Sequence, residues 1–178
     1  MRRRWTPAAT KRTRRRSPPP SPAARFRAIP AGETAWRAHG ARMLALEREE
    51  WAERAFSRSE MRRQIASPRS VVAVVEIAND LVGFAVATPG WSAGAATLNN
   101  VLIAPAHRGR GLVWPLLAEI ERELLARDYR TMVIDARVEN GFADAVERHY
   151  RDRARVLADD HPSPYGPQRT IQVTLTER

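Results

Sequence analysis

A short basic turn, His107-Arg108-Gly109-Arg110-Gly111-Leu112, has the residue types best suited to binding an anion. Its two glycines let the backbone approach a ligand closely. A helix that begins here directs unpaired N–H groups and the positive end of its dipole toward that ligand. The two arginines add charge-assisted hydrogen bonds. The turn therefore predicts a phosphate site, although a basic strand-to-helix bend has the same local pattern.

The elements on either side of this turn must hold it in place. A β-rich run from about Thr97 to Ile103 precedes it and ends before Pro105. Apolar residues at helical spacing follow, which predicts a helix from about Leu112 to Arg127. Pro115 fits only the first turn of a helix, where its missing N–H group has no partner to lose. The helix must therefore begin near Gly111.

The rest of the chain alternates short strands and helices. Thr34 is predicted to cap one helix, and Ser57 with Glu60 forms a capping box for the next. The further predicted elements are a strand at 25–29, a hairpin of strands at 71–75 and 81–86, a strand at 131–134, a helix at 141–150, and closing strands at 156–157 and 171–175. This order predicts a mixed α/β fold with about six to seven strands and about four helices.

The net charge of +10 is concentrated at one end of the chain. Residues 1–27 hold ten of the thirty basic residues and no acidic residue, so residues 28–178 have no net charge. This distribution excludes a globular core that binds nucleic acid through its overall charge. Residues 1–24, rich in arginine and proline, are predicted to be a disordered tail, and residues 25–178 one domain.

The tail allows several interpretations. Its arginine runs are typical of a nucleic-acid or ribosome-binding arm or of an anchor for an anionic surface. An organelle transit peptide is Arg-rich and acid-free as well, but five prolines within 22 residues disfavour it. The remaining interpretation is an unstructured leader without a function, as from a start codon assigned too far upstream. Arginine outnumbers lysine 29 to 1 in the whole chain, so a compositional bias of the genome is sufficient to produce such a leader without selection. A weak contact with nucleic acid through residues 1–27 remains an alternative interpretation of the tail.

Several chemistries are excluded by composition. There is no cysteine, so disulfides, thiol catalysis and cysteine-ligated zinc do not occur, and the four scattered histidines have no zinc spacing. The serines lack a nucleophile-elbow motif. No apolar stretch approaches the length of about 18 residues that a membrane span needs, and a secretory signal is absent. We expect a cytoplasmic protein without a metal.

At the glycine-rich turn the chain resembles the GNAT superfamily of N-acetyltransferases, whose signature is Arg/Gln-x-x-Gly-x-Gly/Ala. The corresponding residues here are Arg108-Gly109-Arg110-Gly111-Leu112-Val113. The lead-in from Val101 to His107 and the strand Leu81-Val82-Gly83-Phe84 are also similar to the family's pattern. The resemblance extends over about residues 25–176 and is specific only around 98–125.

The resemblance implies that acetyl-CoA is the cosubstrate. Its pyrophosphate is expected on the backbone amides of the turn, and its pantetheine arm on the backbone of the preceding strand, with Asn140 as a further candidate. The expected cofactor-binding residues are Val101, Leu102, Ile103, Arg108, Gly109, Arg110, Gly111, Leu112, Val113 and Asn140. Val113 departs from the pattern, because the family usually has Gly or Ala there.

Acetyl transfer to an amine needs a base for the amine and benefits from an acid for the leaving thiolate. Tyr150 is the candidate acid, by resemblance to the family's tyrosine on the helix after the fifth strand. Many relatives have a carboxylate on the fourth strand, where this chain has Asn99-Asn100. Glu76 is then the best remaining carboxylate on a predicted strand, and we take it as the candidate base.

The sequence thus predicts an acetyl-CoA-dependent N-acetyltransferase that acts on a small-molecule or protein amine. Two alternatives stay open. A GNAT-like module that binds CoA or a partner without turnover is favoured by the missing fourth-strand carboxylate and by Val113. A nucleic-acid or ribosome-associated protein that acts through its basic tail is the other. The acceptor and the oligomeric state do not follow from the sequence.

Overall fold

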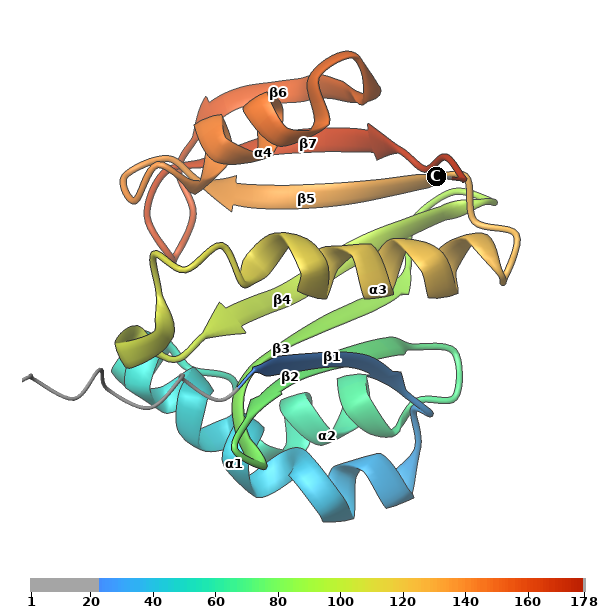
Figure 1. The fold of residues 1–178 in the computed structure, drawn as a ribbon. Helices are drawn as coiled ribbons and strands as arrows, with labels where there is room; N and C mark the ends of the chain where they lie inside the picture. Colours follow the sequence, from blue (N-terminus) through green and yellow to red (C-terminus); the bar gives the residue numbers. More distant parts are fainter. Residues whose placement is uncertain (1–22, 178) are drawn as a thin grey trace, which may run out of the picture.

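The computed structural model describes residues 23–177. Its strands form one mixed sheet in the order β1-β2-β3-β4-β5-β7-β6 (Figure 1). The strands are β1 (Ala24–Ile29), β2 (Val71–Ile77), β3 (Asp80–Pro89), β4 (Ala95–Ile103), β5 (Thr131–Arg137), β6 (Ala154–His161) and β7 (Gln168–Thr174). Among these seven strands of the described residues, only β4 and β5 pair in parallel, and every other neighbouring pair is antiparallel.

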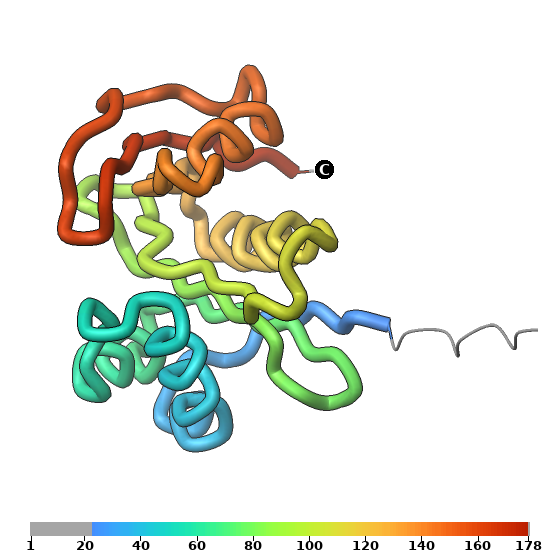
Figure 2. Tube along the Cα trace, turned by 90° about the vertical axis from the view of Figure 1, so that its left-hand side faces the viewer, coloured from blue at the N-terminus to red at the C-terminus, as the bar shows by residue number. Residues whose placement is uncertain are grey.

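Four α-helices cover the two faces of this sheet. They are α1 (Glu33–Trp51), α2 (Arg58–Ala66), α3 (Val113–Leu125) and α4 (Phe142–Tyr150), with short 3₁₀ turns at Ala52–Arg54, Pro105–His107 and Arg151–Arg153. Figure 2 shows α1 and α2 on one face and α3 and α4 on the other. Because α3 packs on one face of β3 and α1 and α2 pack on the other, this strand is apolar almost throughout rather than alternating.

The predicted order of elements and the mixed α/β fold are confirmed. The capping box of Ser57 and Glu60 is present at the start of α2, and Pro115 is the third residue of α3. The prediction that Thr34 caps the first helix is wrong, because α1 begins one residue before it, at Glu33, and has no side-chain cap. Gly32 precedes that helix, and its N–H donates to the carbonyl of Ile65, so a tertiary contact sets the start. Of the predicted tail, all but the last two residues lie outside the described residues, and β1 begins at Ala24.

The parallel strands β4 and β5 separate partway along their length. Their ladder runs from Ala95 opposite Thr131 to Leu98 opposite Ile134 and then stops, although β4 continues to Ile103. A β-bulge marks the point of separation, because Leu98 lies opposite Ala87 and Asn100 opposite Val86, which leaves Asn99 as the extra residue. Within the described residues, the edge of β4 beyond Leu98 that faces β5 therefore has no ladder partner.

Candidate active site

The basic turn joins the end of β4 to the start of α3, as the sequence predicts. Gly109 and Gly111 have φ angles of 71° and 72°, the left-handed region that favours glycine. A Cβ atom at either position would meet nothing within 4 Å, so conformation and not space requires glycine here. α3 begins at Val113, and the N–H groups of its first turn have no partner within the helix. The turn can therefore hold an anion with backbone donors.

Arg108 contacts the end of β4 directly and the end of β5 through Glu50. Its Nε donates to the carbonyl of Ile103 at 2.9 Å, and its guanidinium pairs with Glu50 at the end of α1. Glu50 also accepts a hydrogen bond of 3.4 Å from Arg137, the last residue of β5. The Arg137 guanidinium lies 4.8 Å from the centre of the Trp51 ring. One carboxylate thus bridges the end of β5 and the residues after β4, on the α1 side of the opening.

A buried carboxylate that sequence reasoning missed lies beside the bulge. Glu47 of α1 is only 1% exposed, and its Oε2 accepts a hydrogen bond of 2.6 Å from the amide of Asn100. Its Oε1 accepts a longer bond of 3.3 Å from the N–H of Phe56. Burial, helped by the charge of Glu50, raises the pKa of Glu47, and the two hydrogen bonds offset part of that rise. A carboxyl group with a raised pKa is suited to proton transfer near neutral pH.

The spacing of buried residues on α1 contains the signal for Glu47. Trp36, Gly40, Met43 and Glu47 follow at intervals of four, three and four residues, so the glutamate stands on the buried stripe of the helix. A lone acidic residue on an apolar stripe is unusual, because burial of a charge needs compensating partners.

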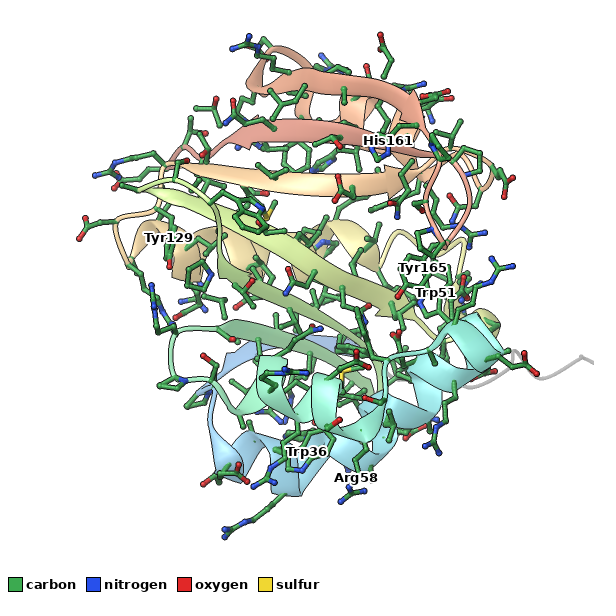
Figure 3. The ribbon with its side chains drawn as sticks, turned by 180° about the vertical axis from the view of Figure 1, so that it is seen from behind. Trp36, Trp51, Arg58, Tyr129, His161 and Tyr165 are labelled. Carbon is green, nitrogen blue, oxygen red and sulfur yellow. The ribbon has the colours of Figure 1, made fainter. Side chains whose placement is uncertain are left out.

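The loop between β6 and β7 encloses this region from the other side. Tyr165 lies edge-on to Trp51, with ring centres 4.9 Å apart (Figure 3). Arg54 holds the loop to the α1–α2 connection, because its Nη1 donates to the carbonyl of Pro164 at 3.0 Å. Burial raises the pKa of Tyr165, and the charges of Glu47 and Glu60 add to the rise. The Trp51 and Tyr165 rings therefore lie on the same side of the sheet as Glu47, close enough for its charge to act on Tyr165.

Glu76 lies away from the bulge, on β2 in the outer pair of strands. It forms an ion pair of 3.0 Å with Arg27 of β1. Hydrogen bonding and charge attraction from Arg27 lower the pKa of Glu76 despite partial burial. A lowered pKa makes the carboxylate a weaker base, and its catalytic role stays a prediction.

Tyr150, the predicted acid, lies in the core between α3 and α4. It is 1% exposed, and its hydroxyl donates to Glu121 of α3 at 2.9 Å. Arg153 pairs with the other oxygen of Glu121 at 3.0 Å. The Tyr150 ring also packs edge-on near Trp114, in the first turn of α3, at 6.5 Å between centres. The structure therefore brings the ring close to α3, but directs the hydroxyl to a carboxylate of that helix.

Asn140 lies at the start of α4, where its Oδ1 accepts a hydrogen bond of 3.0 Å from the N–H of Phe142. Its cofactor contact stays a prediction. Among residues 23–177, no group of three or more His, Asp or Glu side chains is arranged to hold a metal ion. None of the helices in this part of the chain is long and apolar enough to cross a membrane.

The chain combines separated parallel strands, a bulge in β4 and a glycine turn before α3. Residues 40–150 match the model of the acetyltransferase (GNAT) family, and the chain belongs to this family. No curated protein sequence is significantly similar to the chain.

Solved structures of several acetyltransferases share the fold. The aminoglycoside 6'-N-acetyltransferase from Enterococcus faecium has a TM-score of 0.66 at 15% identity, covering 85% of this chain and 98% of that one. The ribosomal-protein-S18-alanine N-acetyltransferase from Escherichia coli has a TM-score of 0.64 at 16% identity, covering 86% of this chain and 96% of that one. An aminoglycoside 6'-N-acetyltransferase complexed with coenzyme A has a TM-score of 0.62 at 15% identity, covering 78% of this chain and 91% of that one. These acetyltransferases act on unlike acceptors, so the fold does not specify the acceptor.

Proposed function

We propose that this protein transfers the acetyl group of acetyl-CoA directly to an amine at the bulge of β4. One observation carries the proposal. The β4–β5 ladder ends at Leu98 while β4 continues to Ile103, directly before the turn that opens α3. An extended ligand with amide groups can pair with the free edge of β4, and its anionic end can then reach the start of α3.

The residues of this region fit coenzyme A in chemical type. The backbone of Val101–Ile103 offers donors and acceptors to the pantetheine amides, and residues 108–113 offer N–H groups to the pyrophosphate. Val113 does not oppose this fit, because its side chain packs partly buried against the core. The family model and the fold shared with a coenzyme A complex support the same cosubstrate.

Acetyl-CoA supplies an activated carbonyl carbon. The neutral amine attacks that carbon, a C–N bond forms, the C–S bond breaks, and the nitrogen loses one proton. Backbone N–H groups on the free edge of β4 near Asn99 are suited to stabilise the negative charge that develops on the carbonyl oxygen.

We propose Glu47 as the group that receives the amine proton, either directly or through one water. Its carboxylate is hydrogen-bonded to Asn100, next to the bulge, and its pKa is raised by burial. Glu76 has a lowered pKa and is paired with an arginine, and it lies on β2, two strands away from β4, so it is the weaker candidate. The leaving thiolate has a solution pKa of roughly 8.5, so an acid such as Tyr150 is helpful rather than obligatory.

A transfer assay with acetyl-CoA and a panel of primary amines, read by release of free thiol, tests the proposal. We expect amine-dependent thiol release and a product heavier by one acetyl group. If calorimetry shows tight acetyl-CoA binding but no amine is acetylated, the protein is instead a CoA-binding module without turnover. If acetyl-CoA does not bind, the cofactor assignment is wrong.

A further inference from the structure

The last turn of α1 carries negative charge where a helix disfavours it. Glu49 and Glu50 both lie in this turn, directly before Trp51, the last residue of the helix. The C-terminal end of a helix is the negative end of its dipole, so carboxylates there are unfavourable unless cations offset them. Ala52, the next residue, has a φ angle of 50°, which is strained for alanine. The end of α1 must therefore be held by contacts with other elements.

Glu50 makes such contacts on both sides of the β4–β5 opening. Its Oε2 pairs with Arg108 of the glycine turn, and its Oε1 accepts a hydrogen bond of 3.4 Å from Arg137 at the end of β5. The Glu50 side chain is only 16% exposed, although both arginines are more accessible. Each oxygen of this carboxylate therefore joins α1 to a different side of the opening.

Glu47 and Glu50 lie one turn apart on α1. Residues three positions apart are neighbours on the surface of a helix. The Oε2 of Glu47 accepts a hydrogen bond of 2.6 Å from the amide of Asn100, so both carboxylates are directed to partners from the β4 side of the molecule. A rotation or shift of the end of α1 that separates Glu50 from its arginines would also move Glu47 relative to the bulge.

Arg108 connects α1 to the strand that carries the bulge. Its Nε donates to the carbonyl of Ile103, the last residue of β4, while its guanidinium pairs with Glu50. The bond with Ile103 does not depend on Glu50, and the φ angles of Gly109 and Gly111 set the shape of the turn. Loss of the Glu50 charge should therefore displace the end of α1 more than it changes the turn.

We propose that Glu50 is a positioning residue for acetyl transfer, because its ion pairs with Arg108 and Arg137 hold Glu47 beside the bulge of β4. This inference rests on the proposed function, in which Glu47 receives the amine proton, and it adds the group that keeps this carboxyl in place. A misplacement of about 1 Å costs about 100-fold in rate. Partly exposed ion pairs contribute little to stability, so the role of Glu50 is geometric.

Glu50→Gln tests this role, because glutamine keeps the size of the side chain and lacks the charge that holds both arginines. We expect kcat to fall about 10- to 100-fold, while calorimetry gives the acetyl-CoA affinity of the wild type. The matched control is Glu49→Gln, an exposed neighbour that should have wild-type kcat. Wild-type kcat in Glu50→Gln, or a loss of acetyl-CoA affinity without a fall in kcat, would overturn the inference.

A double-mutant cycle shows whether Glu50 acts through Glu47. In a protein that already carries Glu47→Gln, there is no carboxyl to misplace. Glu50→Gln should therefore lower the residual kcat by less than about threefold in that background. A merely structural role would lower kcat by the same factor in both backgrounds, and this result would overturn the inference.

The pH profile gives a readout that a general loss of stability would not move. The charge of Glu50 contributes to the raised pKa of Glu47. Around this carboxyl also lie the neutral amide of Asn100 on β4, the N–H of Phe56 and, from the β6–β7 loop, Tyr165, whose pKa is raised. In Glu50→Gln, the fall of kcat/KM on the acid side should therefore move to lower pH, while the matched control keeps the wild-type profile. An unmoved profile would overturn the inference.

A crystal structure of Glu50→Gln separates this inference from the proposed function, because it needs no turnover. We expect the hydrogen bond between Glu47 and Asn100 to be lost and the glycine turn to keep its shape. If that bond is lost but the wild type acetylates no amine, the proposed function fails and the effect of Glu50 on Glu47 stands. An intact bond between Glu47 and Asn100 in the variant would overturn the inference whatever the activity.

Discussion

The two sides of the β4–β5 opening are built from different parts of the chain. On the proposed cofactor side, the free edge of β4 and the turn to α3 form one continuous stretch, and their backbone groups are the proposed binding groups. On the acceptor side, side chains from α1, β4 and the β6–β7 loop meet, with Glu47 and Asn100 separated by 53 positions in the chain.

This difference determines what each side can tolerate. A site made of backbone N–H groups survives most side-chain changes, but it fails when a residue cannot adopt the required φ angle. A site made of side chains fails when a single functional group is exchanged, even though the fold remains. Variants on the two sides should therefore affect different measurements, namely turnover on the acceptor side and acetyl-CoA affinity on the cofactor side.

Glu47→Gln is expected to have the largest effect. The amide keeps the size of the side chain but cannot accept a proton, so kcat should fall by about 10²- to 10⁴-fold with acetyl-CoA affinity unchanged. Steady-state kinetics and calorimetry measure the two quantities. The control is Glu49→Gln, an exposed neighbour on α1, which should have wild-type turnover. Wild-type kcat in Glu47→Gln, with chemistry rate-limiting, would place the base elsewhere.

The pH dependence of wild-type activity also tests whether Glu47 is the base. Glu47 must be ionised to accept a proton, so kcat/KM should fall as the pH decreases through its pKa. Because burial raises the pKa of Glu47, this fall should occur at a higher pH than an ordinary glutamate would give. The residual activity of Glu47→Gln should lack this step. An unchanged step in the variant would assign it to another group.

Gly111→Val tests the cofactor side. Valine at a φ of 72° is strained by about 1–3 kcal/mol, so the turn should reshape and acetyl-CoA affinity should fall about 10- to 100-fold. The control is Gly94→Val in the β3–β4 loop, where φ is 73° and a Cβ also meets nothing within 4 Å. Both variants should lose similar stability, and only Gly111→Val should lose affinity by calorimetry. Equal affinities in the two variants would remove the turn from the binding site.

Tyr150→Phe separates a structural role from the predicted acid role. The variant leaves a buried carboxylate, Glu121, without one hydrogen bond, so the free energy of unfolding should decrease by about 1.5–3 kcal/mol. Chemical denaturation measures this change. A 10- to 1,000-fold fall in turnover with unchanged stability would support the acid role instead.

Glu76→Gln should have the smallest effect. Its ion pair with Arg27 is partly exposed, so the free energy of unfolding should decrease by less than about 1 kcal/mol. Turnover should equal that of the wild type. Arg27 lowers the pKa of Glu76, so this small stabilisation exists above the ordinary glutamate pKa and disappears as the pH falls through the lowered value. A large fall in kcat would restore Glu76 as the base.

The position of the glycine turn, where we propose that the cofactor binds, could be predicted from the sequence because its signals are local. Two glycines, a proline in the first turn and apolar spacing over one helix fix the turn within a few residues of Gly111. The acceptor side could not be predicted in the same way. Whether Glu47 or Glu76 lies beside the bulge depends on how α1 packs on β4. The direction of the Tyr150 hydroxyl also depends on Glu121, a partner 29 positions away in the chain. The start of α1 likewise follows from a contact with Ile65 rather than from Thr34.

A structure of the protein with bound coenzyme A tests the central claim most directly. The account predicts hydrogen bonds between the pantetheine amides and the backbone of β4 after Leu98, and pyrophosphate oxygens on the N–H groups of residues 109–113. The sulfur should lie at the bulge, on the side where Glu47 and Asn100 meet. Coenzyme A bound elsewhere, or a β4–β5 ladder that continues past Ile134 and closes the opening, would contradict the account.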